Sequence, residues 1–262
     1  MLNVIVTGAA GKMGKTHIKT VVEDKNARLA GAVEVKGNPA IGTDAGVLAG
    51  VQPTGFPVVD DLSMIPGADV LIDFTVPSSL PGHLEYAVKH NMALVIGTTG
   101  LTDKEIRLID EASAKIPLIW APNFSIGVNI LAKLTKIAAE ILRDDFDPEI
   151  VEMHHRMKKD APSGTALRLL NILKDAYQSD DVVFGREGIG GERPAKQIGV
   201  MALRGGDVVG DHTVIFAGIG ERVELTHKAS TRETFARGAL RAAKYITGKK
   251  PGRYTIEDVL GF

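Results

Sequence analysis

The chain has 262 residues, of which 44% are hydrophobic and 24% charged, and it contains 29 glycines but no cysteine. That length suffices for one large domain or two smaller ones, and the composition is that of an ordinary α/β protein. The 31 basic and 32 acidic side chains leave a net charge of −1, so no basic excess points to nucleic acid or a membrane surface. The lack of cysteine excludes disulfides, thiolate catalysis and cysteine-ligated metals.

The N-terminus carries no recognisable targeting signal. Met1 is followed directly by an apolar, strand-like run at residues 2–7, without a basic leader and a cleavage site. No apolar run approaches the length of a membrane span. We therefore expect a cytoplasmic protein.

A strand, a glycine-rich turn and a helix open the chain. The apolar residues 2–7 are followed by Gly8, Gly11 and Gly14, and then by apolar residues at helical spacing. In a dinucleotide-binding turn such glycines allow the tight turn, the close approach of a pyrophosphate and the packing of helix on strand. A tight turn without any ligand has the same pattern.

Glu34 favours the dinucleotide interpretation. It ends the next predicted strand, residues 28–34, twenty residues after Gly14, where an acid that bonds the adenine ribose diol is expected. A solvated carboxylate at a strand end is the competing interpretation. Lys36 lies close enough to pair with a 2′-phosphate, so both NADH and NADPH are candidate cofactors.

Strands and helices continue to alternate to about residue 125, which predicts a mostly parallel sheet. Further strands are expected at residues 68–75, 93–97 and 116–120, and a helix begins at Thr102 with Glu105 completing a capping box. A ligand of such a sheet lies across the carboxyl ends of its strands. The loops at these ends are residues 8–14, Glu34, Phe74 with Thr75, residues 97–100 and residues 121–124.

The pattern changes in the second half of the chain. A core helix is expected at residues 128–142, and the next strands follow one another with only one helix, after Gly164, among them. This predicts a second domain of α+β type with a mixed or antiparallel sheet. The polar loop 178–196 is long enough to be functional or interfacial. The helix at 231–247 and the segment 254–259 are expected to pack on the first domain. The expected strands are residues 149–157, 198–203, 211–217 and 222–229.

The segment 152–166, Glu-Met-His-His-Arg-Met-Lys-Lys-Asp-Ala-Pro-Ser-Gly-Thr-Ala, concentrates the residues with catalytic potential. A strand leads into it and a helix leads out. Ser163 or a neighbour can cap that helix, which leaves the amides of Gly164 and Thr165 facing an anion. Histidines and cations beside such a turn predict a pocket for a small acidic molecule with a proton donor next to it.

The two adjacent histidines are not equivalent. Because side chains alternate along a strand, His154 shares a face with Glu152, whereas His155 points to the other face unless the strand ends near it. His154 and Lys158 are therefore the stronger candidates, and a packing role is the alternative for His155. Asp160 is placed to hold Lys158 or Arg156. No His-Glu-x-x-His or comparable spacing occurs, so no metal site is predicted.

These motifs resemble those of the 4-hydroxy-tetrahydrodipicolinate reductases, or dihydrodipicolinate reductases, of diaminopimelate and lysine biosynthesis. The central motif is His154-His155-x-x-Lys158-x-Asp-Ala-Pro-Ser-Gly164-Thr165, and the resemblance extends over essentially the whole chain. The other matching motifs are Gly-Ala-Ala-Gly-Lys-Met-Gly at 8–14, Asp-Phe-Thr-x-Pro at 73–77, Gly-Thr-Thr-Gly at 97–100, Ala-Pro-Asn-Phe-Ser-x-Gly-Val-Asn at 121–129, Arg-Gly-Gly-Asp-Val-Val-Gly-Asp-His-Thr at 204–213 and Gly-Glu-Arg-x-Glu-Leu-Thr-His-Lys-Ala at 220–229.

The resemblance implies two domains. Residues 1–126 and 235–262 would form a Rossmann-type, parallel-sheet dinucleotide domain. Residues 127–234 would form an α+β domain with a mixed open sheet for substrate binding and oligomerisation. The implied protein is a homotetrameric NAD(P)H-dependent oxidoreductase that acts on a small cyclic dicarboxylate. Its nicotinamide gives a hydride to one ring carbon, and a proton reaches the neighbouring carbon.

Roles follow from position in the motifs. His154 and Lys158 are the implied catalytic residues, with His154 as the general acid. The substrate carboxylates would be held by His155, Lys158, Gly164 and Thr165. The implied cofactor-binding residues are Gly8, Ala9, Ala10, Gly11, Lys12, Met13, Glu34, Gly97, Thr98, Thr99, Ala121, Pro122, Asn123 and Phe124.

Two positions depart from the family pattern. Many relatives carry arginine directly after the ribose-binding acid and within the Phe-Thr-x-Pro motif, where this chain has Val35 and Val76. Both departures leave the choice between NADH and NADPH open. Two other functions are compatible with the sequence: a non-catalytic dinucleotide-binding sensor, indifferent to dicarboxylates, and a different imine reductase of the same architecture.

Overall fold

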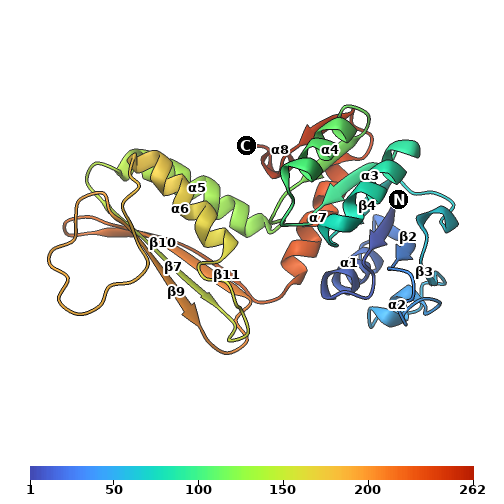
Figure 1. The fold of residues 1–262 in the computed structure, drawn as a ribbon, viewed down its shortest axis with the longest axis horizontal. Coiled ribbons are helices and arrows are strands. Elements are labelled where there is room, and N and C mark those ends of the chain that lie inside the picture. Colours follow the sequence, from blue (N-terminus) through green and yellow to red (C-terminus); the bar gives the residue numbers. More distant parts are fainter. The chain divides into compact units, whose positions relative to one another are not determined.

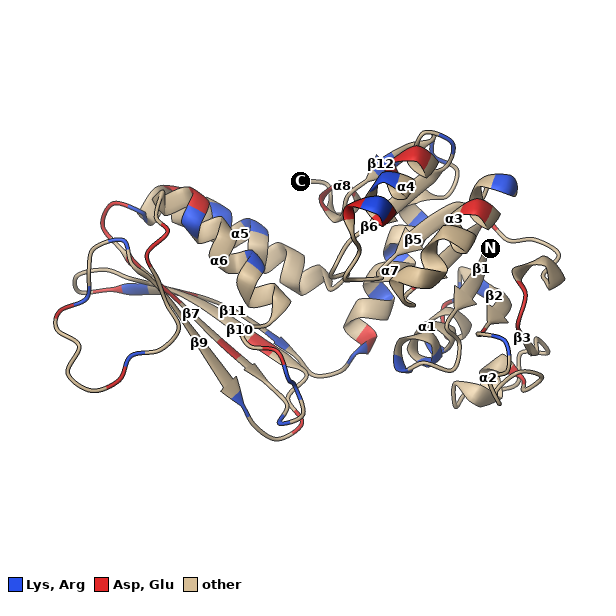
Figure 2. Ribbon diagram, viewed as in Figure 1, with Lys and Arg blue, Asp and Glu red and all other residues tan.

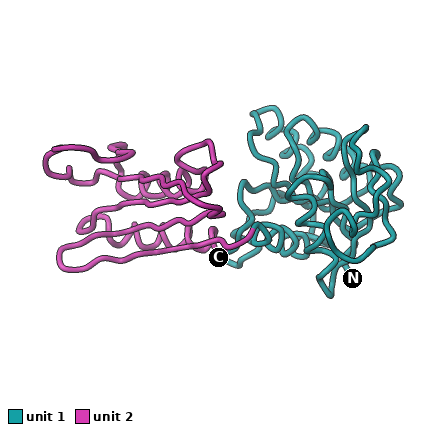
Figure 3. Tube along the Cα trace, turned by 90° about the horizontal axis from the view of Figure 1, so that it is seen from below, with its two compact units in different colours: residues 1–126, 232–262 teal, residues 127–231 magenta.

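The computed structural model describes residues 1–262, and the chain divides into two compact units (Figure 3). Unit 1 comprises residues 1–126 and 232–262, and unit 2 comprises residues 127–231. None of the helices is both long and apolar enough to cross a membrane.

Unit 1 is built on a seven-stranded sheet in the order β12-β6-β5-β4-β1-β2-β3, in which every pair of neighbours is parallel. Six of these strands follow the 3-2-1-4-5-6 order of a Rossmann fold, and β12 extends the β6 edge. The strands are β1 (Leu2–Thr7), β2 (Ala27–Val33), β3 (Val58–Val59), β4 (Val70–Asp73), β5 (Ala93–Ile96), β6 (Pro117–Trp120) and β12 (Gly252–Tyr254). The helices are α1 (Lys12–Val22), α2 (Ala45–Leu48), α3 (Leu80–Lys89), α4 (Asp103–Ser113), α7 (Glu233–Ile246) and α8 (Ile256–Leu260), with short 3₁₀ turns η1 (Leu62–Met64) and η2 (Pro77–Ser79).

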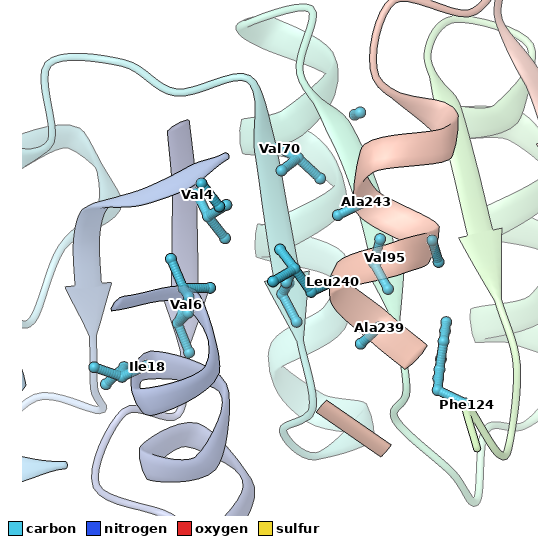
Figure 4. Packing of buried hydrophobic residues seen from close by; sticks show 14 of the residues in the cluster. Val4, Val6, Ile18, Val70, Val95, Phe124, Ala239, Leu240 and Ala243 are labelled. Carbon is cyan, nitrogen blue, oxygen red and sulfur yellow. The ribbon is translucent and has the colours of Figure 1, made fainter. Parts of the chain in front are cut away.

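Helices cover both faces of this sheet, which explains why its strands are continuously apolar. All four residues of β4 and all four of β5 are buried. On one face, Val4, Val6 and Val95 pack against Ile18 of α1 and Leu240 of α7 (Figure 4). The other face packs against the apolar sides of α3 and α4. The capping box predicted for α4 is present, with the amide of Thr102 donating to Glu105 at 2.8 Å.

The carboxyl ends of the strands in unit 1 fall in register. Thr7 pairs with Val33 on one side and Asp73 on the other, Asp73 pairs with Ile96, and Ile96 pairs with Trp120. The loops that follow these residues therefore begin along one edge of the sheet, as the alternation of strands and helices predicted.

Unit 2 contains a mixed five-stranded sheet in the order β11-β10-β7-β9-β8, antiparallel from β11 to β7 and parallel from β7 to β8. Two helices lie across one face of it (Figure 1), and Leu131, Ile150, Leu169 and Val214 are among the buried residues between helices and sheet. The elements are α5 (Ile126–Leu142), β7 (Asp147–His154), α6 (Gly164–Tyr177), β8 (Val182–Val183), β9 (Ile198–Arg204), β10 (Gly210–Ala217) and β11 (Arg222–Ala229). The predicted fold class, a parallel α/β sheet plus a mixed sheet, is confirmed.

One local expectation was wrong, and two short elements were not predicted. Strand β7 ends at His154, not at residue 157, because the chain turns there and the amide of Lys158 donates to the carbonyl of His155 at 3.0 Å. The segment 37–57 contains the four-residue helix α2, capped by Asp44, which the sequence did not indicate. Near the C-terminus, residues 252–254 add a strand to the sheet of unit 1, which their composition did not indicate.

Candidate active site

The glycine-rich turn after β1 needs its glycines for steric reasons. Gly8 has φ +65°, and its carbonyl accepts a hydrogen bond from the amide of Gly11 at 3.0 Å. A Cβ on Gly14 would lie 2.0 Å from that same carbonyl oxygen, so helix α1 can only pack here with glycine. Gly11 stands at the N-cap of α1 without a side-chain cap. This turn and the start of α1 have the form that binds a pyrophosphate.

Glu34 joins this turn to the end of β2. Its carboxylate accepts hydrogen bonds from the amides of Ala10 and Val35, both at 2.8 Å. Glu34 also lines a cavity of about 780 Å³ in unit 1 together with Gly8, Gly11, Lys36 and other residues of the strand ends. The volume suits part of a nucleotide.

The other predicted cofactor residues lie along the same strand ends but do not line this cavity. The hydroxyl of Thr98 accepts from the amide of Thr75 at 3.1 Å, and the indole of Trp120 donates to the carbonyl of Thr98 at 3.1 Å. Gly97 packs against the ring of Phe74, since a Cβ on it would lie 2.2 Å from that ring, and the ring of Phe74 is tilted against that of Phe124 with centroids 5.3 Å apart. Ala9, Thr98, Ala121 and Phe124 are buried, Ala10, Met13, Gly97 and Asn123 half-buried, and Lys12, Thr99 and Pro122 exposed.

Asp73, at the end of β4, organises the middle of this edge. Its side chain is fully buried and accepts from Thr7 at 3.2 Å, from the hydroxyl of Thr75 at 2.6 Å and from Nδ1 of His83 at 3.0 Å. Burial alone would raise the pKa of Asp73, but the bonds from His83 and Thr75 outweigh it and hold that pKa below its usual value. His83 lines the cavity of unit 1.

In unit 2, Glu152 and His154 point to the buried face of β7, as strand alternation predicted. Nδ1 of His154 lies 2.5 Å from Oε2 of Glu152. Arg204, at the end of β9, binds both oxygens of Glu152 at 3.0 Å, and the amide of Ser163 donates to Oε1 at 3.1 Å. His212 of β10 lies edge-on to His154, with ring centroids 5.1 Å apart, and Nε2 of His212 contacts the hydroxyl of Ser163 at 2.9 Å.

Lys158 lies in the turn after β7. Its Nζ donates to both carboxylate oxygens of Asp160 at 2.9 Å, as expected, and 19% of its side chain is exposed. His155 is half-buried, and its Nδ1 has no hydrogen-bond partner. Gly164 is exposed at the start of α6 with open space around it, and Thr165 follows it.

The N-cap of α6 is Ser163, as one of the predicted alternatives had it. Its hydroxyl accepts from the amide of Ala166 at 3.2 Å. Ser163 lies only three residues after Asp160, the partner of Lys158. The start of α6 therefore belongs to the same short segment as His154 and Lys158.

The charges around His154 oppose one another. Burial lowers the pKa of His154 below its ordinary value, the charges of Lys158 and Arg204 act in the same direction, and Glu152 opposes them. Burial also lowers the pKa of His212, to about 4. For Glu152, burial alone would raise the pKa, but its bonds from Arg204, His154 and Ser163 outweigh burial and lower it. The free protein therefore holds an ionised carboxylate beside a histidine that gives up its proton readily.

Known proteins resemble this chain along its whole length. The profile of the N-terminal part of dihydrodipicolinate reductase matches residues 2–124, and that of the C-terminal part matches residues 127–260. A 4-hydroxy-tetrahydrodipicolinate reductase from Anaeromyxobacter dehalogenans is 51% identical over 265 residues, covering 100% of this chain and 98% of the relative. One from Syntrophus aciditrophicus is 48% identical over 266 residues, covering 100% and 99%.

The chain belongs to the dihydrodipicolinate reductase family.

Solved structures agree with this membership. A dipicolinate-bound dihydrodipicolinate reductase from Paenisporosarcina sp. is 26% identical, with a TM-score of 0.77 over 97% of each chain. A probable dehydrogenase from Thermotoga maritima is only 14% identical, with a TM-score of 0.59 over 98% of this chain and 92% of its own, and so shares the fold alone. As a member of a family of oxidoreductases, this chain is an enzyme that uses a nicotinamide dinucleotide.

The sequence assigned no role to four side chains of these clusters, Asp73, His83, Glu152 and Arg204. Asp73 and Glu152 hold the two histidines His83 and His154. The alternation along β7 had already placed Glu152 on the face of His154, so that contact could have been inferred. The contact of Arg204 could not, because it depends on the register of β9 against β7.

Charges in this reductase are not segregated. Figure 2 shows lysines and arginines interspersed with aspartates and glutamates along both units. No group of three or more histidine, aspartate or glutamate side chains is placed to hold a metal ion. The two cations near His154 are Lys158 and Arg204, and each forms an ion pair with a carboxylate.

Proposed function

We propose that this protein reduces 4-hydroxy-tetrahydrodipicolinate to tetrahydrodipicolinate and water in diaminopimelate and lysine biosynthesis, with NADH or NADPH as the hydride donor. Family membership and about half identity to curated reductases over the full chain support the reaction. The observation that carries the proposal is the His154–Glu152 pair, which lies in one short segment with Lys158 and the start of α6. Such a segment offers a proton and positive potential to a dicarboxylate.

We assign the cofactor to residues 1–126 with 235–262 and the substrate to residues 127–234. Gly8 and Gly14, the uncapped start of α1 and Glu34 fit a dinucleotide. The amides of the turn and of α1 would bind the pyrophosphate, and Glu34 the ribose diol. The residues of the loops after β5 and β6, 97–99 and 121–124, would complete the cofactor site. The bound nicotinamide supplies the hydride.

His154 is the proposed general acid. A proton must reach the ring carbon next to the one that receives the hydride, and a histidine is the side chain best suited to give it near neutrality. The half-buried Lys158 would assist as the second donor and would offset charge on the substrate. Two carboxylates brought beside His154 raise its pKa again, because they favour the imidazolium. Substrate binding would thus load the acid.

The substrate carboxylates would be held by His155, Lys158 and the start of α6. Gly164 leaves the first turn of that helix open, so an anion can approach the backbone. The partial positive charge of a helix N-terminus attracts it. Thr165 would contribute its backbone to the same anion.

We further propose that the protein prefers NADH. Glu34 shares its cavity with Asp60 and Asp61, and Lys36 is the only lysine or arginine among the residues that line it. Val35, which follows Glu34, is 70% exposed and cannot pair with a phosphate. Three carboxylates against one lysine repel the added charge of a 2′-phosphate.

Equilibrium binding of both cofactors tests this preference. We expect NADH to bind about tenfold more tightly than NADPH at low ionic strength, and the difference to shrink as salt screens the carboxylates. Val35→Arg should close the gap by pairing with the 2′-phosphate. Equal or tighter binding of NADPH to the unmodified protein would contradict the proposal.

We also propose a cytoplasmic homotetramer assembled through the sheet of unit 2. The face of that sheet not covered by α5 and α6 carries Val151, Met201 and Ile215, half-buried in the single chain, and Leu203, which is 49% exposed. Light scattering should give four times the chain mass of 27.9 kDa. Leu203→Asp should lower that mass, because a charge on a buried apolar face opposes association.

The reaction itself is tested by following the oxidation of NADH and NADPH in parallel with enzymatically generated substrate. We expect turnover that is lost in the His154→Ala plus Lys158→Ala double variant, while that variant still binds the dinucleotide. Full activity of the double variant would refute the proposed site. Cofactor binding without any response to dicarboxylates would instead identify a sensor.

A further inference from the structure

Glu152 is a buried carboxylate whose oxygens are both saturated by donors. Oε1 accepts from Arg204 and from the amide of Ser163, and Oε2 accepts from Arg204 and faces Nδ1 of His154. The side chain of Glu152 has no exposed surface. A buried carboxylate that faces an arginine and an amide is ionised and can only accept.

This fixes which nitrogen of His154 carries the hydrogen. Because Oε2 of Glu152 cannot donate, Nδ1 must hold a hydrogen to make a bond of 2.5 Å. The nitrogen that gains and loses a proton is therefore Nε2. Without this partner a neutral histidine would divide between two tautomers, and only the one with its hydrogen at Nδ1 leaves Nε2 free to take up the proton that the imidazolium later gives.

Gly210 leaves room on the Nε2 side of the ring. A Cβ at Gly210 would lie 3.0 Å from Nε2 and 3.4 Å from Cδ2 of His154. A Cβ there would require the imidazole to shift by a few tenths of an ångström. Glu152 thus holds the ring at Nδ1, and Gly210 of β10 leaves the space that the ring occupies at Nε2.

The charges that face His154 come from three strands and one turn. Glu152 lies on β7, Arg204 at the end of β9, His212 on β10, and Lys158 in the turn after β7. Asp160 ties the two cations together, since its carbonyl accepts from Arg204 at 2.6 Å and its carboxylate accepts from Lys158 at 2.9 Å. Each cation is therefore held by an acceptor that is not His154.

We propose that Glu152, fixed by Arg204, is the positioning residue that locks the tautomer of His154 and assigns proton donation to Nε2. This inference rests on the proposed function for its role in turnover, but not for the tautomer itself. In the proton step the N–H bond at Nε2 breaks and a C–H bond forms on the substrate ring. The neutral imidazole keeps its hydrogen at Nδ1 on Glu152, and solvent restores the proton at Nε2.

Opposite effects are expected from the two partners. Glu152→Gln removes the charge that favours the imidazolium and should lower the pKa of His154, whereas Arg204→Gln removes an opposing charge and should raise it. Glu152→Asp keeps the charge and should restore the tautomer in part. If Glu152 and Arg204 merely supported the fold, their replacement would not shift the pKa of His154 in opposite directions.

The test is a pH titration of the protein with ¹⁵N-labelled histidine, followed by NMR, together with kcat and KM for each variant. We expect a single tautomer with hydrogen at Nδ1 in the unmodified protein, and mixed tautomers with about a 100-fold loss of kcat in Glu152→Gln at nearly unchanged KM. If Glu152→Gln does not fold, Arg204→Gln and Glu152→Asp carry the same test. An unchanged tautomer and pKa in all three variants would overturn the inference. The expected NMR result without dicarboxylate reduction would overturn the proposed function alone.

Discussion

Two buried carboxylate–histidine pairs occur in this protein, one in each unit, and they differ in what holds the carboxylate. Asp73 meets His83 at 3.0 Å, and its other oxygen takes hydroxyl and amide donors from Thr7 and Thr75. Glu152 meets His154 at 2.5 Å and is held by an arginine. The first pair has only neutral support around its carboxylate, and the second is embedded among cations.

The difference indicates that the two carboxylate–histidine pairs have different roles. The bonds of Asp73 join the ends of β1 and β4 and place His83 at the wall of the cavity in unit 1. Those of Glu152 act on a histidine whose pKa is lowered by burial and by two cations. A buried carboxylate can therefore either brace a cavity wall or set the proton of an acid, depending on its other partners.

Removing each histidine should separate these uses most clearly. His154→Ala should lower kcat about 1000-fold, since general acid catalysis contributes factors of this size. His83→Ala should instead raise the KM for the cofactor with a much smaller change in kcat. Steady-state kinetics on both variants measures this. Equal losses of kcat would mean that the two pairs do not differ in function.

The carboxylate of the first pair should matter for stability. Asp73→Asn is expected to cost about 2–3 kcal/mol of unfolding free energy, because it weakens several bonds to a buried charge. The folded pKa of Asp73 lies below the ordinary 3.8, so this contribution is present above that pH and is lost as the pH falls through the folded value. Urea denaturation at two pH values measures it. The shape of the pH profile of kcat should not change, in contrast to Glu152→Gln.

His17 offers a histidine with no carboxylate at all. It is buried against Phe74, with ring centroids 4.3 Å apart, and neither of its nitrogens has a partner. Burial lowers its pKa from 6.5 to about 3, so below pH 6.5 the unfolded chain binds a proton that the folded chain refuses. Stability should therefore fall as the pH falls from 6.5 towards 3.

Replacing this side chain should remove that dependence. The gain in unfolding free energy from His17→Leu is expected to be larger at pH 5 than at pH 8 by about 2 kcal/mol. Chemical denaturation of both proteins at both pH values gives the difference. A gain that is independent of pH would show that His17 does not titrate on unfolding.

The smallest expected effect comes from the glycine beside the second pair. Gly210→Ala should lower kcat about tenfold, since its Cβ would crowd Nε2 of His154 at 3.0 Å and tilt the ring. Gly190→Ala, in an exposed loop with open space around it, is the matched control and should have no effect. Equal activity of the two variants would show that the ring can shift without consequence.

Much of unit 1 could be predicted because its information is local. Apolar runs, glycines at the end of β1 and the capping box of α4 each follow from neighbouring residues. The same is true of the cap on α6, although its exact residue required the structure. Contacts that depend on register were not predictable. Arg204 reaches Glu152 only because β9 pairs in parallel with β7. His212 reaches the ring of His154 only because β10 pairs with β7 in the antiparallel direction.

The site showed the same division. Strand alternation put His154 and Glu152 on one face, whereas the early end of β7 at His154 depends on the turn that follows. Asp73 was read as part of a motif, but its bond to His83 requires α3 to pack over the end of β4. Pairing within one strand or turn is thus accessible to sequence, and pairing between elements is not.

We propose that His154 lacks its proton in the free protein and receives it when a dicarboxylate binds. Calorimetry of dipicolinate binding at pH 7.5, in buffers of different ionisation enthalpy, counts the protons taken up. Net uptake is expected for the unmodified protein, because two carboxylates raise the pKa of a histidine that burial and neighbouring cations had lowered. That uptake should vanish in His154→Ala. No uptake by the unmodified protein, or the same uptake by the variant, would show that His154 does not receive a proton when the dicarboxylate binds.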